Sequence, residues 1–237
     1  MDGGNLRSYL DKKRCNMATS INFSTLDLAW VIADGLADIQ YNRCIHRDLK
    51  SHNILLSTKK YFKLADFGLT HNIDTSMTRG VGTLAWIAPE VLTGERYGFP
   101  AEIYSFGVVL TELDTREIPY LNLQLFPYAF MNGVCNGSLR PSLRQNCSLC
   151  YKKWVENCLA HDPSQRPTAL EIVSIIHAQL FPKDQAIQSE YNQLNTTQVL
   201  SKLSIEDNKS STKSIPSTTS LSKSVSTLDI AEIRCPK

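Results

Sequence analysis

The sequence predicts a mainly α-helical domain that contains a short β-hairpin and is followed by a disordered tail. Apolar residues recur at helical spacing in several long segments, two short β-type runs flank a polar turn, and the C-terminal part is rich in Ser and Thr. Hydrophobic residues make up 42% of the 237 residues, which is enough for a packed core. These differences in composition and apolar spacing divide the chain into residues 1–23, 24–181 and 182–237.

Residues 1–23 open with two glycines and Asn5, followed by a short helical pattern that begins at Leu6 and by a polar connector. Residues 24–181 begin with Ser24-Thr-Leu-Asp27, which resembles a capping box. Apolar residues then recur every three or four positions. This spacing predicts a long amphipathic helix that ends near Tyr41.

The next segments complete the predicted domain. Asn53-Ile-Leu-Leu56 and Tyr61-Phe-Lys-Leu64 are β-type runs separated by a polar stretch, which predicts a hairpin. Residues 101–113 are apolar on nearly every side, as in a buried helix. Thr168-Ala-Leu-Glu171 is a full capping box and predicts a final helix that extends to about Leu180.

The apolar periodicity fades from Pro182 onward, and 17 of the last 56 residues are Ser or Thr. Such a composition cannot bury enough apolar surface to offset the entropy of ordering the chain. We therefore expect residues 182–237 to form a Ser/Thr-rich, low-complexity tail that is mostly disordered.

The overall charge and hydropathy exclude several classes of protein. The net charge of +2 argues against a dedicated nucleic-acid binder, whose domain is usually far more basic. The sequence has no run of 18 apolar residues and no apolar N-terminal segment, so we predict neither a transmembrane helix nor a signal peptide.

Seven cysteines are irregularly spaced, and no secretory signal accompanies them. This pattern indicates reduced thiols and a cytoplasmic location. Cys147 and Cys150 form a lone C-x-x-C pair, whereas a structural zinc site requires four ligands. Two ordinary thiols are therefore favoured over a zinc or redox site.

Three polar side chains carry the chemistry that the sequence suggests. Asp48 and Asn53 are five positions apart in one loop, and Asp66 follows across the predicted hairpin, so the three can converge on one point. Oxygen ligands beside a lysine suit Mg²⁺ and phosphate oxygens, because Mg²⁺ prefers a few carboxylates completed by substrate phosphates. Phosphoryl transfer needs positioning, charge neutralisation and an acceptor for the hydroxyl proton.

The same residues resemble the motifs of the protein kinase family. His46-Arg-Asp-Leu-Lys-Ser-His-Asn53 resembles its catalytic loop, Asp66-Phe-Gly68 its magnesium motif, and Ala88-Pro-Glu90 the end of its activation segment. One tripeptide alone is weak evidence, but three in the family's order and spacing are strong. The resemblance covers residues 1 to about 181 and implies the C-terminal lobe of the α+β protein-kinase fold.

The resemblance implies ATP and Mg²⁺ as cofactors and a role for each site residue. Asp48 would accept the substrate hydroxyl proton, and Lys50 would neutralise the transferring phosphoryl group. Asn53 and Asp66 would bind magnesium, and Thr83 would bridge Asp48 and Lys50 in an active arrangement. The expected nucleotide-binding set is Met1 at the hinge, Asn5 at the ribose, Leu55 at the adenine floor, and Lys50, Asn53 and Asp66 at the phosphates.

Regulation is also implied by the resemblance. Arg47 precedes the catalytic aspartate, and in the family this arginine pairs with phosphate on the activation segment. Thr75, Ser76 and Thr78 are the candidate acceptors, and Thr78 is the first choice among them. The alternative, favoured for any one of the three taken alone, is that they are merely polar loop residues. An upstream activating kinase is the partner that this arrangement implies.

A further set of residues is expected to be structural. Glu90 should pair with Arg166 in a buried ion pair, and His46 and Phe67 belong to the structural part of their motifs. Glu102 departs from the family, which usually has Asp there to accept hydrogen bonds from the catalytic-loop backbone. The additional methylene is expected to cost about 1–3 kcal/mol if it overpacks the site.

The leading interpretation is a Ser/Thr protein kinase that transfers the ATP γ-phosphate to a protein. Lys50, together with Gly82-Thr-Leu-Ala-Trp86, is similar to Ser/Thr kinases of the tyrosine-kinase-like group. The alternatives are a non-catalytic, pseudokinase-like protein-binding module and, disfavoured by the long activation segment, a small-molecule kinase.

The resemblance also implies parts that these residues do not contain. A complete kinase has a Gly-rich loop, a strand Lys and a helix Glu that grip ATP, and none is found in the 237 residues. We expect either an incomplete gene model, whose full-length form could be membrane-anchored by an upstream segment, or a genuine pseudokinase without the upper lobe. In both cases the transition-state charge would lie in a high dielectric, so we expect weak ATP affinity and little turnover from this chain alone.

Overall fold

The computed structural model describes residues 1–59, 61–66, 84–123, 125–182 and 233–234. The chain forms two compact units, one of Met1–Ile176 with Ile230–Lys237 and one of His177–Asp229. The described part of the second unit is residues 177–182, the end of the last helix and the two residues after it. The candidate site lies entirely in the first unit.

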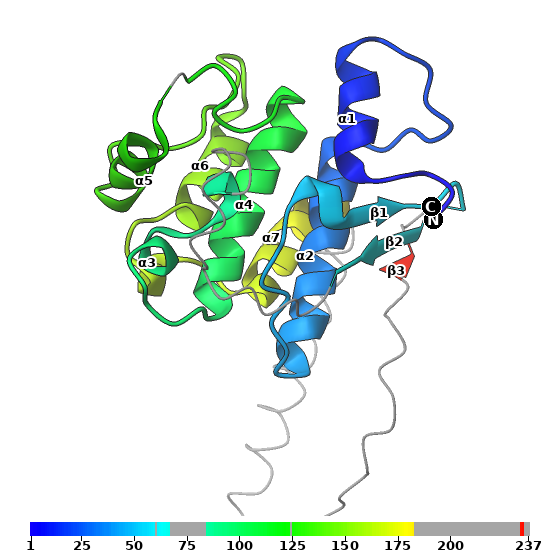
Figure 1. The fold of residues 1–237 in the computed structure, drawn as a ribbon. Helices are drawn as coiled ribbons and strands as arrows, with labels where there is room; N and C mark the ends of the chain where they lie inside the picture. Colours follow the sequence, from blue (N-terminus) through cyan, green and yellow to red (C-terminus); the bar gives the residue numbers. More distant parts are fainter. Residues whose placement is uncertain (60, 67–83, 124, 183–232, 235–237) are drawn as a thin grey trace, which may run out of the picture. The chain divides into compact units, whose positions relative to one another are not determined.

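Helices dominate the described residues, as the sequence predicted (Figure 1). The α-helices are α1 Leu6–Arg14, α2 Thr25–Tyr41, α3 Pro89–Leu92, α4 Phe99–Thr115, α5 Pro127–Cys135, α6 Leu149–Cys158 and α7 Ala169–Leu180. Short 3-10 turns cover Ser51–Asn53, Leu84–Trp86 and Pro163–Gln165. The strands are β1 Ile54–Leu56, β2 Tyr61–Leu64 and β3 Ile233–Arg234.

Side-chain caps fix the starts of the helices that the sequence located. The Ser24 hydroxyl accepts the Asp27 N–H at 3.0 Å, and the Asp27 carboxylate accepts the Ser24 N–H at 3.1 Å, which completes the predicted capping box of α2. Thr168 and Glu171 make the same reciprocal pair at the start of α7. Both predicted helix starts are confirmed.

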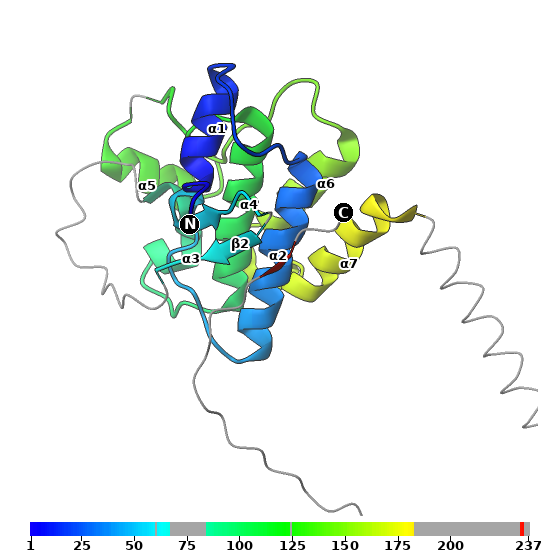
Figure 2. The same ribbon diagram turned by 90° about the vertical axis from the view of Figure 1, so that its right-hand side faces the viewer.

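Helix α4 forms the centre of the core. Every residue from Ala101 to Asp114 is buried, and the helix packs against both α2 and α6 (Figures 1 and 2). It begins two residues before the predicted start, because Pro100 is well placed in a first turn. It ends where Arg116 adopts a left-handed conformation, with φ of 62°.

Strands β1 and β2 form the predicted antiparallel hairpin, with Ile54 opposite Leu64 and Leu56 opposite Phe62. Asn53, which the sequence placed in the first strand, instead ends a 3-10 turn that leads into β1. The hairpin lies beside α2 (Figures 1 and 2).

The C-terminal segment contributes one strand to this sheet. Residues 233–234 pair with β2 as β3, although the sequence predicted disorder for most of the tail. Backbone pairing needs only an open strand edge, which composition does not report. Residues 183–232 and 235–237 of the predicted tail lie outside the described residues.

Helices α3, α5 and α6 were not predicted, because each is short and its apolar pattern is weak. Their start signals are nevertheless present: α3 and α5 begin with a proline, and the Ser148 hydroxyl caps α6 by accepting the Tyr151 N–H at 3.3 Å. Within the described ranges, no helix has the length and apolar character needed to cross a membrane.

Candidate active site

The loop between α2 and β1 holds the candidate catalytic residues, and α4 fixes its backbone. The N–H groups of His46 and Arg47 both donate to Oε1 of Glu102, the second at 3.1 Å. Arg47 has a φ of 69°, a left-handed conformation that is uncommon for a residue with a side chain. The buried carboxylate therefore stabilises a turn that the loop sequence alone would not favour.

Asp48, Lys50 and Asn53 meet in one hydrogen-bonded cluster. The Lys50 ammonium lies 2.7 Å from Oδ2 and 3.0 Å from Oδ1 of Asp48. The Asn53 amide group donates to the same Oδ2 and to the Asp48 carbonyl, both at 2.8 Å. These bonds hold the Asp48 side chain in place, and because it is 27% exposed, solvent can still reach it.

The orientation of Asn53 leaves an oxygen for a cation. Both bonds to Asp48 use the side-chain nitrogen, and no described residue donates to Oδ1. An amide oxygen held in this way suits Mg²⁺, which takes oxygen ligands and completes its shell with water or phosphate. The described residues contain no cluster of three or more His, Cys, Asp or Glu side chains that could hold a metal.

Asp66 follows the end of β2 and is brought next to this cluster by the backbone. The Ala65 N–H donates to the Asn53 carbonyl at 2.8 Å, and Asp66 itself is exposed, with a φ of 62°. The backbone thus brings Asn53, just before β1, close to Asp66, just after β2. Their assignment as magnesium ligands stays a prediction.

His46 lies beneath the cluster and connects its parts. The ring is fully buried and makes a hydrogen bond with the backbone of Ala65. Burial lowers the pKa of His46, and this bond and the charges of Asp48 and Asp66 only partly oppose the effect. A neutral histidine therefore joins the catalytic loop to the end of β2.

The segment before α1 lies against β1, where the sequence placed the nucleotide. Gly3 N–H donates to the Leu56 carbonyl at 3.0 Å, and Leu56 N–H donates to the Gly4 carbonyl at 2.8 Å. A Cβ on Gly3 would lie 2.6 Å from the Leu56 carbonyl oxygen, so glycine is required for this approach.

The predicted adenine and ribose residues stand along the same strand. Leu55 is half-buried between Ile54 and Leu56, which are completely buried, so its side chain points to the opposite face of the strand. Met1 is 44% exposed. Asn5 caps α1 by accepting the Ser8 N–H at 2.8 Å, which leaves its side-chain nitrogen for a ligand.

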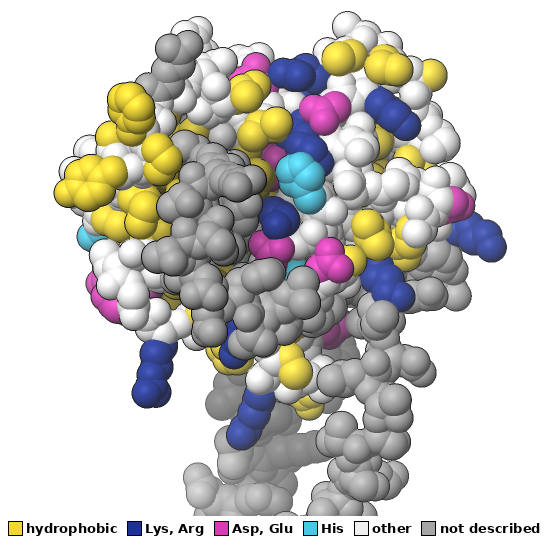
Figure 3. Space-filling view, in the orientation of Figure 1, with side chains coloured by type: hydrophobic (Ala, Val, Ile, Leu, Met, Phe, Trp, Pro, Cys, Tyr) yellow, Lys and Arg dark blue, Asp and Glu magenta, His cyan; other side chains and the backbone are white. Residues whose placement is uncertain are grey.

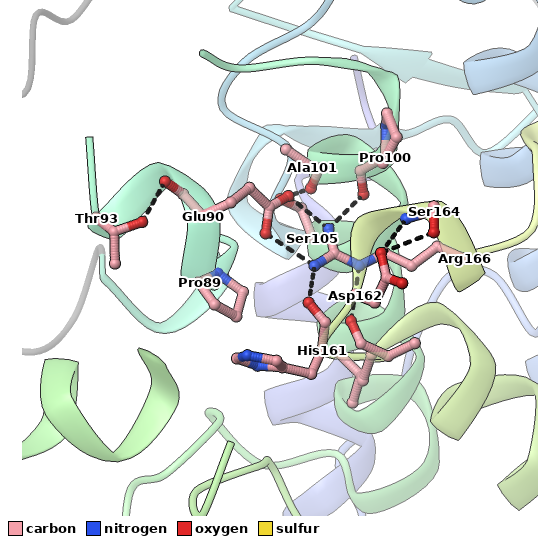
Figure 4. Close-up of polar contacts among 12 residues, drawn as sticks. Pro89, Glu90, Thr93, Pro100, Ala101, Ser105, His161, Asp162, Ser164 and Arg166 are labelled. Carbon is pink, nitrogen blue, oxygen red and sulfur yellow. Dashed lines mark hydrogen bonds and ion pairs between the residues drawn. The ribbon is translucent and has the colours of Figure 1, made fainter. Parts of the chain in front are cut away.

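A buried ion pair joins Glu90, in α3, to Arg166 (Figure 4). The Arg166 guanidinium binds both carboxylate oxygens of Glu90, at 2.6 and 2.8 Å, as the sequence predicted. Arg166 also donates to backbone carbonyls, including those of Pro100 and Ala160, each at 2.9 Å, and lies over the Tyr104 ring. These bonds satisfy the buried charge and make the pair structural.

Glu102 occupies the place where the resemblance led us to expect Asp. It is fully buried, and desolvation raises its pKa to about 7 against the two backbone hydrogen bonds that favour the ionised form. Both of those bonds are present, so the longer side chain still reaches the loop.

Five predicted residues, Phe67, Thr75, Ser76, Thr78 and Thr83, lie outside the described residues. Arg47, the candidate partner of a phosphate at Thr75, Ser76 or Thr78, is exposed in the loop before Asp48.

Sequence reasoning missed one group of residues next to the site. Arg7, Ser51 and Trp86 all donate to the carboxylate of Glu112 in α4. A carboxylate within a helix predicted to be buried was the available signal, because such residues are rarely buried without partners.

Side chains of several kinds are exposed on the face seen in Figure 1. Figure 3 shows acidic, basic and histidine side chains near the middle of that face, with hydrophobic side chains collected to one side of them.

The model of the protein kinase domain matches residues 1–181. The chain belongs to the protein kinase family.

Curated kinases from several organisms are similar to this chain. A probable serine/threonine-protein kinase of Dictyostelium discoideum is 35% identical over 74% of the chain and 13% of its own length. The serine/threonine/tyrosine-protein kinase HT1 of Arabidopsis thaliana is 36% identical over 74% of the chain and 45% of its own length. The mitogen-activated protein kinase kinase kinase dlk-1 of Caenorhabditis elegans is 36% identical over 65% and 17% respectively. The chain thus spans less than half of each of these kinases.

Proposed function

We propose that this chain carries the catalytic centre for transfer of the ATP γ-phosphate to a Ser or Thr hydroxyl of a protein. The observation that carries the proposal is the cluster in which Asp48 is bound by Lys50 at 2.7 Å and by Asn53 at 2.8 Å. Membership of the protein kinase family and the names of the relatives support it.

Asp48 is proposed to orient the acceptor hydroxyl and take its proton. The amide of Asn53 and the ammonium of Lys50 fix the carboxylate from two sides, while solvent reaches the remaining surface. This combination of fixed position and access is what general base catalysis by a carboxylate requires. Lys50 also supplies positive charge where charge develops on the transferred group.

The residues fit magnesium and ATP. Oδ1 of Asn53 and the exposed carboxylate of Asp66 would supply two oxygen ligands, and phosphate oxygens would complete the shell. Bound Mg²⁺ would supply neutralisation of the phosphate charge. Leu55 would form the floor of the adenine site, with the segment from Met1 to Asn5 beside it.

Ser or Thr as the acceptor is proposed from Lys50, two positions after Asp48, which is similar to Ser/Thr kinases. Phosphorylation at Thr75, Ser76 or Thr78 by an upstream kinase, read out by Arg47, is proposed on the same ground. These assignments rest on resemblance rather than on contacts within the described residues. A cytoplasmic location is proposed from the odd number and irregular spacing of the cysteines in the sequence.

We further propose that these 237 residues alone bind ATP weakly and turn it over slowly. They contain no Gly-rich loop and no strand lysine to cover the phosphates, and Asp48 is open to solvent. A water-exposed site stabilises transition-state charge less than a closed one. A non-catalytic protein-binding module is the second candidate, which this openness favours.

The test has two arms. Isothermal titration of the chain with MgATP should give weak binding that Asp66→Asn abolishes. A fusion of the chain behind a complete N-terminal kinase lobe should label casein from γ-labelled ATP, and Asp48→Asn should remove that labelling. A folded fusion that binds MgATP but never labels protein would support the binding module instead.

A further inference from the structure

The carboxylate of Glu112 joins three segments that are far apart in the sequence. The residue is fully buried in α4. Its Oε1 accepts from Nη1 of Arg7 at 2.9 Å and from the Ser51 hydroxyl at 2.6 Å, and its Oε2 accepts from Nε1 of Trp86 at 2.9 Å. The three donors belong to α1, to the catalytic loop and to the turn before Ala88.

Stability alone does not account for this buried charge. Desolvation raises the pKa of Glu112, and the hydrogen bonds from Ser51, Trp86 and Arg7 oppose that shift. Apolar side chains that pack well can often replace a buried ion pair without loss of stability. A carboxylate differs from them because it fixes the direction of each donor that it accepts.

On the catalytic side, the bond to Ser51 fixes the start of the 3-10 turn Ser51–Asn53. Asn53, at the other end of this turn, donates twice to Asp48. Lys50, the residue before the turn, binds the same carboxylate. The position of Ser51 therefore determines where Asp48 is held.

On the other side, Trp86 ends the 3-10 turn that comes just before Ala88-Pro-Glu90. It is 5% exposed, its carbonyl accepts from the Ser105 hydroxyl at 2.7 Å, and its ring meets that of His52 edge to face at 6.0 Å. Under the proposed function, this part of the chain lies beside the acceptor protein.

Arg7 ties the nucleotide side to the same carboxylate. Its guanidinium also donates to the carbonyls of Arg116 at 2.7 Å and Glu117 at 3.2 Å, which follow α4, and to Asp11 at 3.1 Å. Helix α1 begins directly after the glycine segment that pairs with β1.

We propose that Glu112 is a positioning residue. It fixes the catalytic loop relative to Trp86, on the side of the acceptor protein, and relative to α1, so that Asp48 meets the acceptor hydroxyl. The consequence for catalysis rests on the proposed kinase function. The coupling itself does not, because it is a property of the folded chain and can be measured without nucleotide or substrate.

The test uses nuclear magnetic resonance on the full chain. The indole N–H signal of Trp86 is assigned by its loss in Trp86→Phe. Ser51→Ala removes one donor from the carboxylate without touching Trp86. If Glu112 couples the two, Ser51→Ala should move the Trp86 indole signal and accelerate its hydrogen exchange about tenfold. Trp86→Phe should conversely accelerate amide exchange across residues 49–53.

Two further variants separate the carboxylate from other routes. Thr111 is buried one position before Glu112, and its hydroxyl donates to the Val108 carbonyl in the same helix. Thr111→Val should therefore leave the Trp86 signal in place. His52→Ala removes the ring contact with Trp86, and the Ser51→Ala effect should persist in that background.

Glu112→Gln is the direct variant, because it keeps the shape but turns an NH₂ group toward at least one donor. It should disturb both segments at once. Should this variant fail to fold, Ser51→Ala still decides. A Trp86 signal that is unchanged in Ser51→Ala, or a change that disappears without His52, would overturn the proposal. Failure of phosphate transfer would leave this result unaffected.

Discussion

The Oε1 atom of Glu102 accepts a hydrogen bond of 3.1 Å from the backbone N–H of Arg47, the residue before the candidate catalytic aspartate. Arg47 holds a left-handed conformation, and Glu102 is fully buried in the core helix α4. The loop geometry around Asp48 therefore depends on a carboxylate that has no contact with solvent.

The stability of the fold should depend on pH through Glu102. Burial raises its folded-state pKa to about 7 from an ordinary value of 4.5. Between these values the folded state binds the proton more tightly, so the contribution of Glu102 is fully present below pH 4.5 and is lost as the pH rises to about 7. We expect a loss on the order of 3 kcal/mol across this pH range.

Urea unfolding of the natural chain and of Glu102→Gln, at pH 5 and pH 8, measures this contribution. The natural chain must be compared with the variant because His46 also makes stability depend on pH. Burial lowers the pKa of His46, so its contribution to stability is lost as the pH falls below 6.5. The glutamine variant should gain stability relative to the natural chain between pH 5 and pH 8. An equal difference at the two pH values would contradict the prediction.

Arg166→Met should destabilise the chain by ~3–5 kcal/mol, because it leaves the Glu90 carboxylate buried without its partner. Glu90 is bound at both oxygens by Arg166, which is itself buried. Thermal or urea unfolding measures the loss. Lys152→Met is the control, since its ion pair with Glu156 is exposed and should contribute almost nothing.

The double variant Glu90→Leu with Arg166→Met removes both charges together. It should be clearly more stable than Arg166→Met alone, because the uncompensated charge is gone. A double variant that is as unstable as the sum of the single variants would show that the backbone bonds of Arg166, rather than the ion pair, dominate.

The sequence was sufficient where the signals were local. Helices α2 and α7 were located by capping boxes, and α4 by its continuous apolar pattern, because these depend on residues a few positions apart. The short helices α5 and α6 were missed, because their stability comes from packing against the rest of the core rather than from their own pattern.

The candidate site divides in the same way. Asp48, Lys50 and Asn53 lie within six positions of one another, so a short motif was enough to predict that they meet. The bond from Arg7 to Glu112 joins residues 105 positions apart. No local pattern reports such a contact, because it depends on how α1 and α4 are placed in the folded chain.

Gly3→Ala should weaken the contact between the N-terminal segment and β1. The new Cβ would lie 2.6 Å from the Leu56 carbonyl oxygen, and backbone atoms on both sides would have to move apart. We expect a loss of about 1–3 kcal/mol in unfolding free energy. Gly98→Ala is the matched control, because its nearest neighbour would lie at 3.6 Å. Equal losses in the two variants would exclude the close approach as the cause.

Gly107→Ala tests the packing of α4 against α6, and two effects of opposite sign compete there. Alanine favours a helix over glycine by about 0.5–1 kcal/mol. The new Cβ, however, would lie 2.8 Å from the Cβ of Cys158 and 2.9 Å from Cδ2 of Leu159. Separating the two helices at this contact costs about 1–3 kcal/mol, so the clash should win and the variant should be less stable.

Urea unfolding can separate the gain in helix propensity from the cost of the clash. It compares the change from Gly107 to Ala in the natural chain with the same change in a Leu159→Ala background. Truncating Leu159 removes one of the two clashes, so the change from Gly107 to Ala should cost less in that background than in the natural one. The Cys158 clash involves a Cβ that truncation to alanine would leave in place, so some cost should remain. A stabilising Gly107→Ala would mean that α6 moves away freely, and that the close packing seen at this point is not what holds α4 and α6 together.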